Sequence, residues 1–275
     1  MATLIPGANN EAELYAELQK IDISVPGLAE GRTTKHTEIW TICRLLSSLA
    51  HAGKLTYPLT VSHTDKPDFF AYLGDAKIGI EVTEATSQNY AECRALAARE
   101  FPDAIIDLGL FRPGKPKLSA VEIRKALSEK RLRSEGWGGN SVEHEWAWYI
   151  QERVDEKLIK LPRYNTHGCQ ETWLSIYSNT PSPNIHQEEA LAILFPLLSD
   201  YWSLSPAFAA IFIEYGQTII RITDEGWEKF ALHNLWRPSG PAVETIENFE
   251  DDVTDEELWN KIMHQPSPTK CQKKF

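Results

Sequence analysis

The chain has 275 residues, 42% of them hydrophobic, which is enough for one large domain or for a domain with a substantial insertion. Its four cysteines lie far apart and form no CxxC pair, which argues against a disulfide framework and a zinc knuckle and fits a reducing cytoplasm. No stretch resembles a transmembrane span, and the first residues lack the pattern of a signal peptide. We therefore expect a cytoplasmic protein with no membrane partner.

The formal net charge of −11 argues at first against a nucleic-acid partner, but the charges are unevenly distributed. Residues 112–133 contain eight basic and two acidic side chains, a local balance of +6 (8 − 2). The basic residues are Arg112, Lys115, Lys117, Arg124, Lys125, Lys130, Arg131 and Arg133. Such a patch can hold backbone phosphates whatever the total charge, and the alternative is a solvated helix face.

A second charge cluster, residues 244–257, has eight acids and no base. We favour a solvated or disordered stretch there. The alternatives are a surface for a protein partner or for a second copy of the chain, and a mimic of nucleic-acid charge.

Apolar periodicity and Gly/Pro boundaries predict the following elements of the first hundred residues: a helix over 11–20, a Gly/Pro/Thr-rich connection to about 34, an amphipathic helix over 35–52, a strand near 57–63, a hairpin over about 68–84 and a helix over 88–100. We assign residues 1–34 to an N-terminal extension. Residues 35–239 are expected to form one α/β domain, in which a mixed central sheet is flanked by helices.

Residues 101–139 resemble an insertion built around a basic helix over about 119–132. Asn140 and Glu143 have the spacing of a capping box, which predicts that the next helix begins there and runs to about 161. The remaining predicted elements are a strand over 172–178, a helix over about 187–201, strands over 208–215 and 218–222, and an acidic segment with a flexible tail over 240–275.

The hairpin places two carboxylates opposite each other. Gly-Asp at 74–75 has the Gly-first composition of a two-residue type II′ turn, so Leu73 pairs with Ala76 and, in the same register, Asp68 faces Glu81. Opposed residues have Cβ atoms about 4.5–5.5 Å apart, and like charges there are destabilising. A metal cation between them would convert this repulsion into a binding site, whereas the alternative is an ordinary hairpin whose acids face water.

The two faces of the hairpin support this register, because a slip by one residue would expose its apolar side. The apolar face comprises Phe69, Ala71, Leu73, Ile78, Ile80 and Val82. Gly79 lies diagonal to Asp68 on the other face, where the lack of a side chain would leave room for a ligand.

Two helical residues complete the candidate site. Glu38 lies at the head of the apolar stripe of the 35–52 helix, where it either points toward the sheet or serves as a first-turn acid beside the helix dipole. Lys157 shares a face with apolar residues of the 140–161 helix. It either extends its stem over the core or reaches a cluster of carboxylates.

A helix carrying Glu, then Pro-Asp opening a strand, then a second strand with Glu-x-Thr resembles the PD-(D/E)XK nuclease superfamily, the restriction-endonuclease-like fold. The resemblance covers roughly residues 35–100, the 140–161 helix and the 172–178 strand. It implies that Asp68, Glu81 and Glu38 hold one or two Mg²⁺ or Mn²⁺ ions, which activate water for attack on a phosphodiester.

The chain departs from the superfamily at Thr83, where a lysine is usual. Two lysines could replace it: Lys66, which lies opposite Thr83 in the hairpin register, and Lys157. Lys77 is less suitable, because four residues along a strand span about 13 Å.

The resemblance therefore implies a metal-dependent nuclease acting on DNA, with RNA as an alternative, in a prokaryotic or phage defence or mobile-element setting. The basic insertion would contact backbone phosphates. The main rival is an inactive nuclease-like fold that serves as a binding or regulatory module, with Thr83 as the mark of lost chemistry. A hydrolase of another phosphate ester is a third alternative.

Overall fold

The hairpin forms as its turn chemistry predicts. In the computed structural model, Gly74 has a φ of +60° at the first position of the turn, a backbone conformation that glycine adopts without a Cβ penalty. The flanking strands pair from Leu73 with Ala76 to Phe69 with Ile80. All six residues of the predicted apolar face are buried. The register and the two faces of this hairpin are therefore confirmed.

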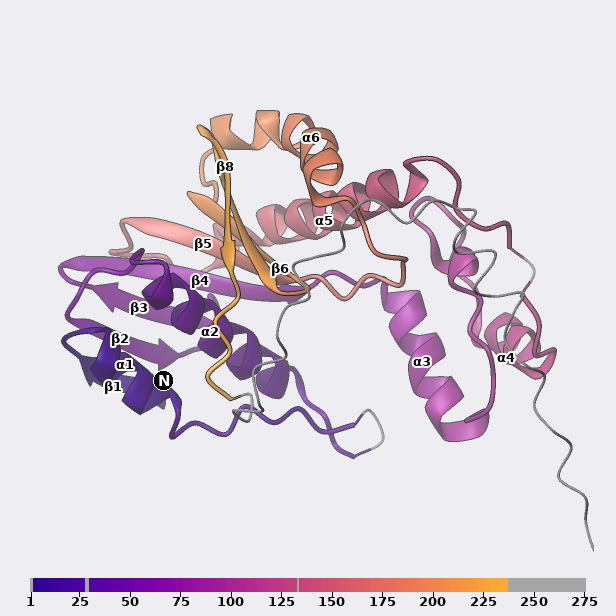
Figure 1. The fold of residues 1–275 in the computed structure, drawn as a ribbon, viewed down its shortest axis with the longest axis horizontal. Helices are drawn as coiled ribbons and strands as arrows, with labels where there is room; N and C mark the ends of the chain where they lie inside the picture. Colours follow the sequence, from indigo (N-terminus) through magenta and orange to yellow (C-terminus); the bar gives the residue numbers. More distant parts are fainter. Residues whose placement is uncertain (1, 28–29, 133, 237–275) are drawn as a thin grey trace, which may run out of the picture. The chain divides into compact units, whose positions relative to one another are not determined.

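The structure describes residues 2–27, 30–132 and 134–236 (Figure 1). Its strands are β1 (Ala2–Ala8), β2 (Leu59–His63), β3 (Phe69–Leu73), β4 (Ala76–Glu84), β5 (Glu171–Tyr177), β6 (Ala210–Tyr215), β7 (Thr218–Thr223) and β8 (Gly226–Ala231). Its α-helices are α1 (Glu11–Leu18), α2 (Thr34–His51), α3 (Gln88–Glu100), α4 (Ala120–Ser128), α5 (Ser141–Lys160) and α6 (Gln187–Leu197). Short 3-10 turns occupy Leu108–Phe111, Leu161–Arg163 and Ser199–Ser203.

Within these residues the eight strands form one mixed sheet in sequence order, β1 to β8. The neighbours β4, β5 and β6 are parallel, and the other pairs are antiparallel. The α/β class with a mixed sheet flanked by helices is thus confirmed. Parallel β4, β5 and β6 end at the same edge, which is where ligands bind in many α/β sheets.

The first residues belong to this sheet. We expected residues 1–34 to form an extension, but β1 pairs with β2, and Leu14 and Leu18 of α1 are fully buried against the core. The strand was missed because its sequence contains Pro6 and Gly7, which are typical of edge strands and weak as strand signals.

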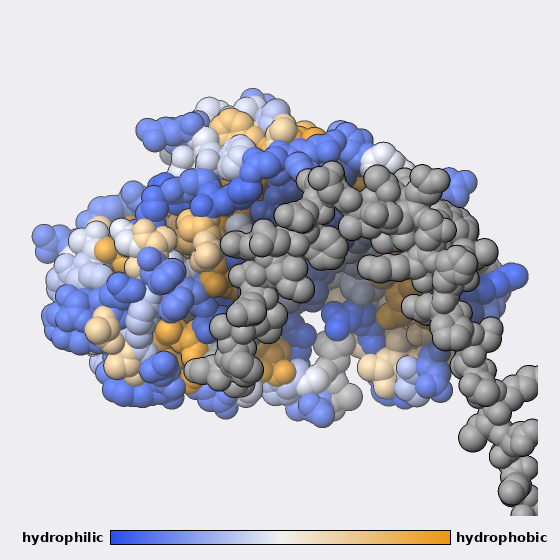
Figure 2. Space-filling view, in the orientation of Figure 1, coloured by the Kyte–Doolittle hydropathy of each residue, from blue (hydrophilic) through white to orange (hydrophobic). Residues whose placement is uncertain are grey.

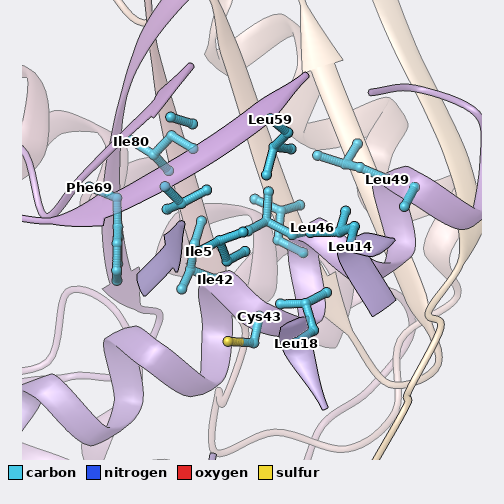
Figure 3. Packing of buried hydrophobic residues seen from close by; sticks show 14 of the residues in the cluster. Ile5, Leu14, Leu18, Ile42, Cys43, Leu46, Leu49, Leu59, Phe69 and Ile80 are labelled. Carbon is cyan, nitrogen blue, oxygen red and sulfur yellow. The ribbon is translucent and has the colours of Figure 1, made fainter. Parts of the chain in front are cut away.

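Two hydrophobic layers cover the sheet. Helices α1 and α2 bury their apolar faces on one side, around Ile42, Leu46 and Phe69 (Figures 1 and 3). Helices α5 and α6 cover the other side, where Trp146 is fully buried. Figure 2 shows a mainly hydrophilic surface on the side in view, broken by small apolar groups.

The insertion packs with α3 in a small, separate hydrophobic core. Residues of α3, α4 and the Leu108–Phe111 turn pack together, with Cys93, Phe111 and Leu127 buried. The basic helix is shorter than expected, since α4 ends at Ser128 and Lys130 adopts a φ of 49° just beyond it.

The predicted capping box of α5 is wrong. The side chain of Asn140 makes no capping hydrogen bond, and Glu143 Oε1 instead accepts a hydrogen bond from the backbone N–H of His186, 2.8 Å away. Glu143 is therefore used to hold α6 to α5, not to begin α5.

The acidic segment and tail, including 244–257, lie outside the described residues, as does Arg133. None of the helices within 2–27, 30–132 and 134–236 has the length and apolar composition that crossing a bilayer requires.

Candidate metal and catalytic site

The hairpin register brings Asp68 and Glu81 to adjoining positions. Asp68 comes directly before β3, one step beyond the last ladder pair of Phe69 with Ile80. The backbone N–H of Val82 donates a hydrogen bond to Asp68 Oδ2 at 2.8 Å. The start of β3 is therefore tied to β4 at the residue that follows Glu81.

The proximity of the two acids is reflected in the charge state of Asp68. Burial, and next the charge of Glu81, raise the pKa of Asp68 from 3.8 to about 7. The charge of Glu38 acts in the same direction, whereas the Val82 N–H bond and the ammonium of Lys157 act in the opposite direction. A carboxyl with such a pKa binds a proton in competition with a metal ion near neutral pH.

Glu81 is 5% exposed and is held through one oxygen only. Its Oε1 accepts hydrogen bonds from Lys157 Nζ at 2.6 Å and from the Tyr164 hydroxyl at 2.8 Å. Its Oε2 is buried and has no hydrogen-bond partner. A buried carboxylate oxygen without a partner is costly, so this atom is a candidate ligand for an ion.

Lys157 is the lysine that the structure brings to the acids. Its Nζ contacts Glu81 and also donates to the carbonyl of Val82 at 3.2 Å. The side chain of Lys66, in contrast, is 63% exposed and its Nζ lies 3.6 Å from the exposed Asp65. Lys77 donates to the carbonyl of His167. Of the two proposed replacements for a lysine at position 83, Lys157 is thus favoured and Lys66 is not.

Glu38 is directed to a different partner. Its Oε2 lies 2.9 Å from Nε2 of His63, the last residue of β2. Glu38 is close enough to raise the pKa of Asp68, but its carboxylate is occupied by the imidazole. Among the described residues the three carboxylates do not form one group of ligands: Asp68 lies beside Glu81, whereas Glu38 is hydrogen-bonded to His63.

We expected Gly79 to leave room for a ligand, but the structure shows no such space. A Cβ at this position would lie 3.1 Å from Pro67 Cγ and 3.4 Å from Thr172 Cγ2. The absence of a side chain at Gly79 allows the segments before β3 and at the start of β5 to pack closely on β4.

The donor set fits Mg²⁺ or Mn²⁺. In the described part of the chain, no three His, Cys, Asp or Glu side chains are grouped to hold a metal ion. Mg²⁺ does not require such a cage, because it is commonly bound through one or two carboxylates, with waters and substrate phosphates completing the shell. Asp68 and Glu81, with the unpartnered Oε2 of Glu81, meet that requirement.

Part of the basic run is used inside the protein. Arg112 donates to the carbonyls of Glu135 and Gly136 and lies 4.4 Å from the ring of Trp137. Arg124 is paired with Glu100 at 2.9 Å, and Nε of Arg131 lies 3.6 Å from Glu129. The exposed members for which the described residues provide no ion pair are Lys115, Lys117, Lys125 and Lys130. Arg112 is thus used within the protein, and these four lysines are the exposed members left for the predicted phosphate contacts in the described part of the run.

Sequence reasoning missed Tyr164 and His63. Tyr164 follows the turn after α5, and no local pattern indicated that its hydroxyl would reach Glu81. His63 could have been found, because extending the hairpin register to β2 pairs it with Phe69. A cavity of about 660 Å³ is lined by His63, Lys66, Arg163 and Asn165 among others, but Asp68 and Glu81 do not line it.

Compared with known proteins, the sequence matches no family model, no curated protein and no solved structure.

Proposed function

We propose that the protein is a metal-dependent nuclease that hydrolyses phosphodiester bonds in DNA, on a core of the restriction-endonuclease-like type. The observation that carries the proposal is that Asp68 lies beside Glu81, just beyond the last ladder pair of the hairpin, with the ammonium of Lys157 on Glu81. Pairs of carboxylates with a neighbouring lysine are suited to a divalent ion and a phosphate at the same place.

Each residue has a distinct role in this proposal. Asp68 and Glu81 would hold Mg²⁺ or Mn²⁺, which when bound supplies Lewis-acid activation of water and neutralises charge on the phosphodiester. Tyr164 and Lys157 fix one oxygen of Glu81 and leave the other, Oε2, without a hydrogen-bond partner and available to an ion. Lys157 supplies the positive charge that Thr83 lacks.

In this proposal, the lysines of the insertion bind DNA beyond the phosphodiester bond that is hydrolysed. Lys115, Lys117, Lys125 and Lys130 would contact backbone phosphates, which gives salt-sensitive attraction that does not depend on base sequence. The chain's overall charge of −11 makes this local patch the more important for holding DNA.

A second candidate is supported by a specific observation. Glu38 is held by His63 and one oxygen of Glu81 by Lys157, so an inactive fold could keep the same contacts as structural ion pairs. In that case the protein is a binding or regulatory module, and Thr83 marks the loss of the catalytic lysine.

A cleavage assay separates the two. Wild type is incubated with supercoiled and linear DNA, and in parallel with RNA, in Mg²⁺, in Mn²⁺ and in EDTA. We expect metal-dependent cutting that falls by ~100-fold or more in Asp68→Asn, since even partners outside the ligand shell cost 10–100-fold.

Asp65→Asn is the matched control, because this neighbouring carboxylate is 92% exposed and its ion pair within the described residues is with the exposed Lys66. It should cut as wild type does. If wild type cuts no polymer while binding DNA or a protein partner, the module is correct and the nuclease proposal is wrong.

A further inference from the structure

A second candidate site lies at the edge where the parallel strands end. A cavity of about 260 Å³ adjoins the last residue of β4 and is lined by Arg32, Thr34, Glu84, Thr86 and Arg94. A second cavity of about 330 Å³ is lined by Trp40, Tyr177 and Asn179. The two share Arg32, Thr37 and Arg94, and therefore adjoin.

The first cavity has an excess of positive charge. Arg32 Nη2 lies 3.3 Å from Glu84 Oε2, and the other oxygen of Glu84 accepts a hydrogen bond from Asn179 Nδ2 at 2.6 Å. The negative charge of Glu84 is thereby balanced by the guanidinium of Arg32. Arg94 has no carboxylate at ion-pair distance among the described residues, and its guanidinium lies 5.9 Å from the ring of Tyr90. Two guanidinium groups facing one carboxylate leave a site for an anion, and their planar donors suit phosphate.

The second cavity is aromatic. The rings of Trp40 and Tyr177 pack edge to face with centroids 4.7 Å apart, and both residues are half-buried. Asn179 lies beside them, and because its Nδ2 donates to Glu84, its Oδ1 is the amide atom that could accept a hydrogen bond from a base. Arg44 Cζ lies 4.2 Å from the centroid of the Trp40 ring and covers one of its faces, which leaves the other faces of the aromatic pair for an unpaired base to stack on.

We infer that these adjoining cavities bind one unpaired nucleotide of the nucleic-acid strand, with its phosphate between Arg32 and Arg94 and its base against Trp40 and Tyr177. Volumes near the lower end of the ~300–1,000 Å³ range of small-molecule sites suit a single nucleotide and not a duplex. The inference rests on the proposed function for the identity of the polymer.

The pocket and the acids lie on opposite faces of the sheet: Glu81 pairs with Leu174 of the α5 layer, whereas Glu84 pairs with Tyr177, whose ring packs on Trp40 of α2. Glu84 lies three residues beyond Glu81 on β4, about 10 Å along a strand. A nucleic-acid strand bound at both places would therefore pass over the edge at which β4 and β5 end. The favoured substrate then has a single-stranded segment beside the bond that is hydrolysed.

The test is a binding measurement without metal. Inorganic phosphate, thymidine and a phosphorylated thymidine dinucleotide are titrated by calorimetry into wild type, Arg94→Gln and Arg99→Gln in EDTA. Arg99 is the matched control, since it lies on the same helix, is 67% exposed and pairs with Glu100. Unfolding midpoints of the three proteins establish that each is folded.

We expect the dinucleotide to bind wild type and Arg99→Gln equally and Arg94→Gln at least tenfold more weakly. It should also bind about fivefold or more tightly than phosphate alone, because of base stacking. Equal affinity of wild type and Arg94→Gln, or of dinucleotide and phosphate, would overturn the inference.

The outcome is separable from that of the nuclease assay. Asp68→Asn should keep the dinucleotide affinity of wild type, because Asp68 is not among the residues that line either cavity. Nucleotide binding without cutting would refute the nuclease alone. DNA cleavage by wild type, together with equal dinucleotide affinity of wild type and Arg94→Gln, would refute this pocket alone.

Discussion

Replacing Asp68 by asparagine removes a charge that the folded state disfavours. The pKa of Asp68 rises from 3.8 to about 7 on folding, mainly through burial and the charge of Glu81. When the pKa of a carboxyl is higher in the folded state than in the unfolded chain, the free energy of unfolding decreases as the pH rises, because the unfolded chain loses its proton at a lower pH. At 1.36 kcal/mol for each pKa unit, a rise of roughly 3 units lowers the free energy of unfolding by ~4 kcal/mol above pH 7. Solvent access to the half-buried side chain reduces this loss toward about 2 kcal/mol.

The assay is urea unfolding in EDTA at pH 5 and pH 8. At pH 8, Asp68→Asn should be more stable than wild type by about 2–4 kcal/mol, and at pH 5 the gain should be smaller by about 1–2 kcal/mol, because Asp68 is then protonated in the folded state. The asparagine oxygen can still accept the Val82 N–H bond. Asp65→Asn should show no such difference between the two pH values. A pH-independent effect of Asp68→Asn would refute the claim that Glu81 and burial act on this carboxyl.

Three further predictions concern the partners of the buried acids. Lys157→Met should reduce cutting per folded molecule by about 100-fold or more, as loss of a charge-stabilising group typically does. Lys66→Met should cut within about twofold of wild type. Equal losses in the two variants would show that Lys66 also contributes to catalysis. Tyr164→Phe deletes a donor to Glu81 and should lower the free energy of unfolding in urea by about 1–3 kcal/mol, and an unchanged value would indicate that the hydroxyl does not hold Glu81. Arg44→Ala breaks the buried pair with Glu214 (2.6 Å) and should cost about 3–5 kcal/mol in the same assay, whereas a cost below 1 kcal/mol would show that the pair is not desolvated.

The hairpin could be predicted in detail because turn chemistry and the period of its strands both act locally. Gly74 allows the turn, and the alternation of apolar residues leaves one register that buries them. Once the register is known, the proximity of Asp68 and Glu81 follows from the backbone alone. Lys157 was identified for a similar reason: a charged residue on an apolar helix face needs a partner at the sheet.

The features that could not be predicted depend on choices between distant side chains. Glu38 could reach either Asp68 or His63, and only the three-dimensional position of β2 decides for His63. The sequence predicts that Arg112 contacts phosphate, but its Nη2 donates to the carbonyls of Glu135 and Gly136, which follow α4 in the chain. Strand β8 was missed because its side chains alternate between half-buried and exposed at a sheet edge, which weakens the apolar signal.

The central claim is that Asp68 and Glu81 together hold a divalent ion. Anomalous diffraction from a crystal soaked in Mn²⁺ tests it most directly. The account predicts one peak within about 2.0–2.6 Å of a carboxylate oxygen of each residue, including Glu81 Oε2, and no peak in Asp68→Asn. A protein that cuts DNA in Mn²⁺ while its manganese lies elsewhere, or an equal peak in Asp68→Asn, would contradict it.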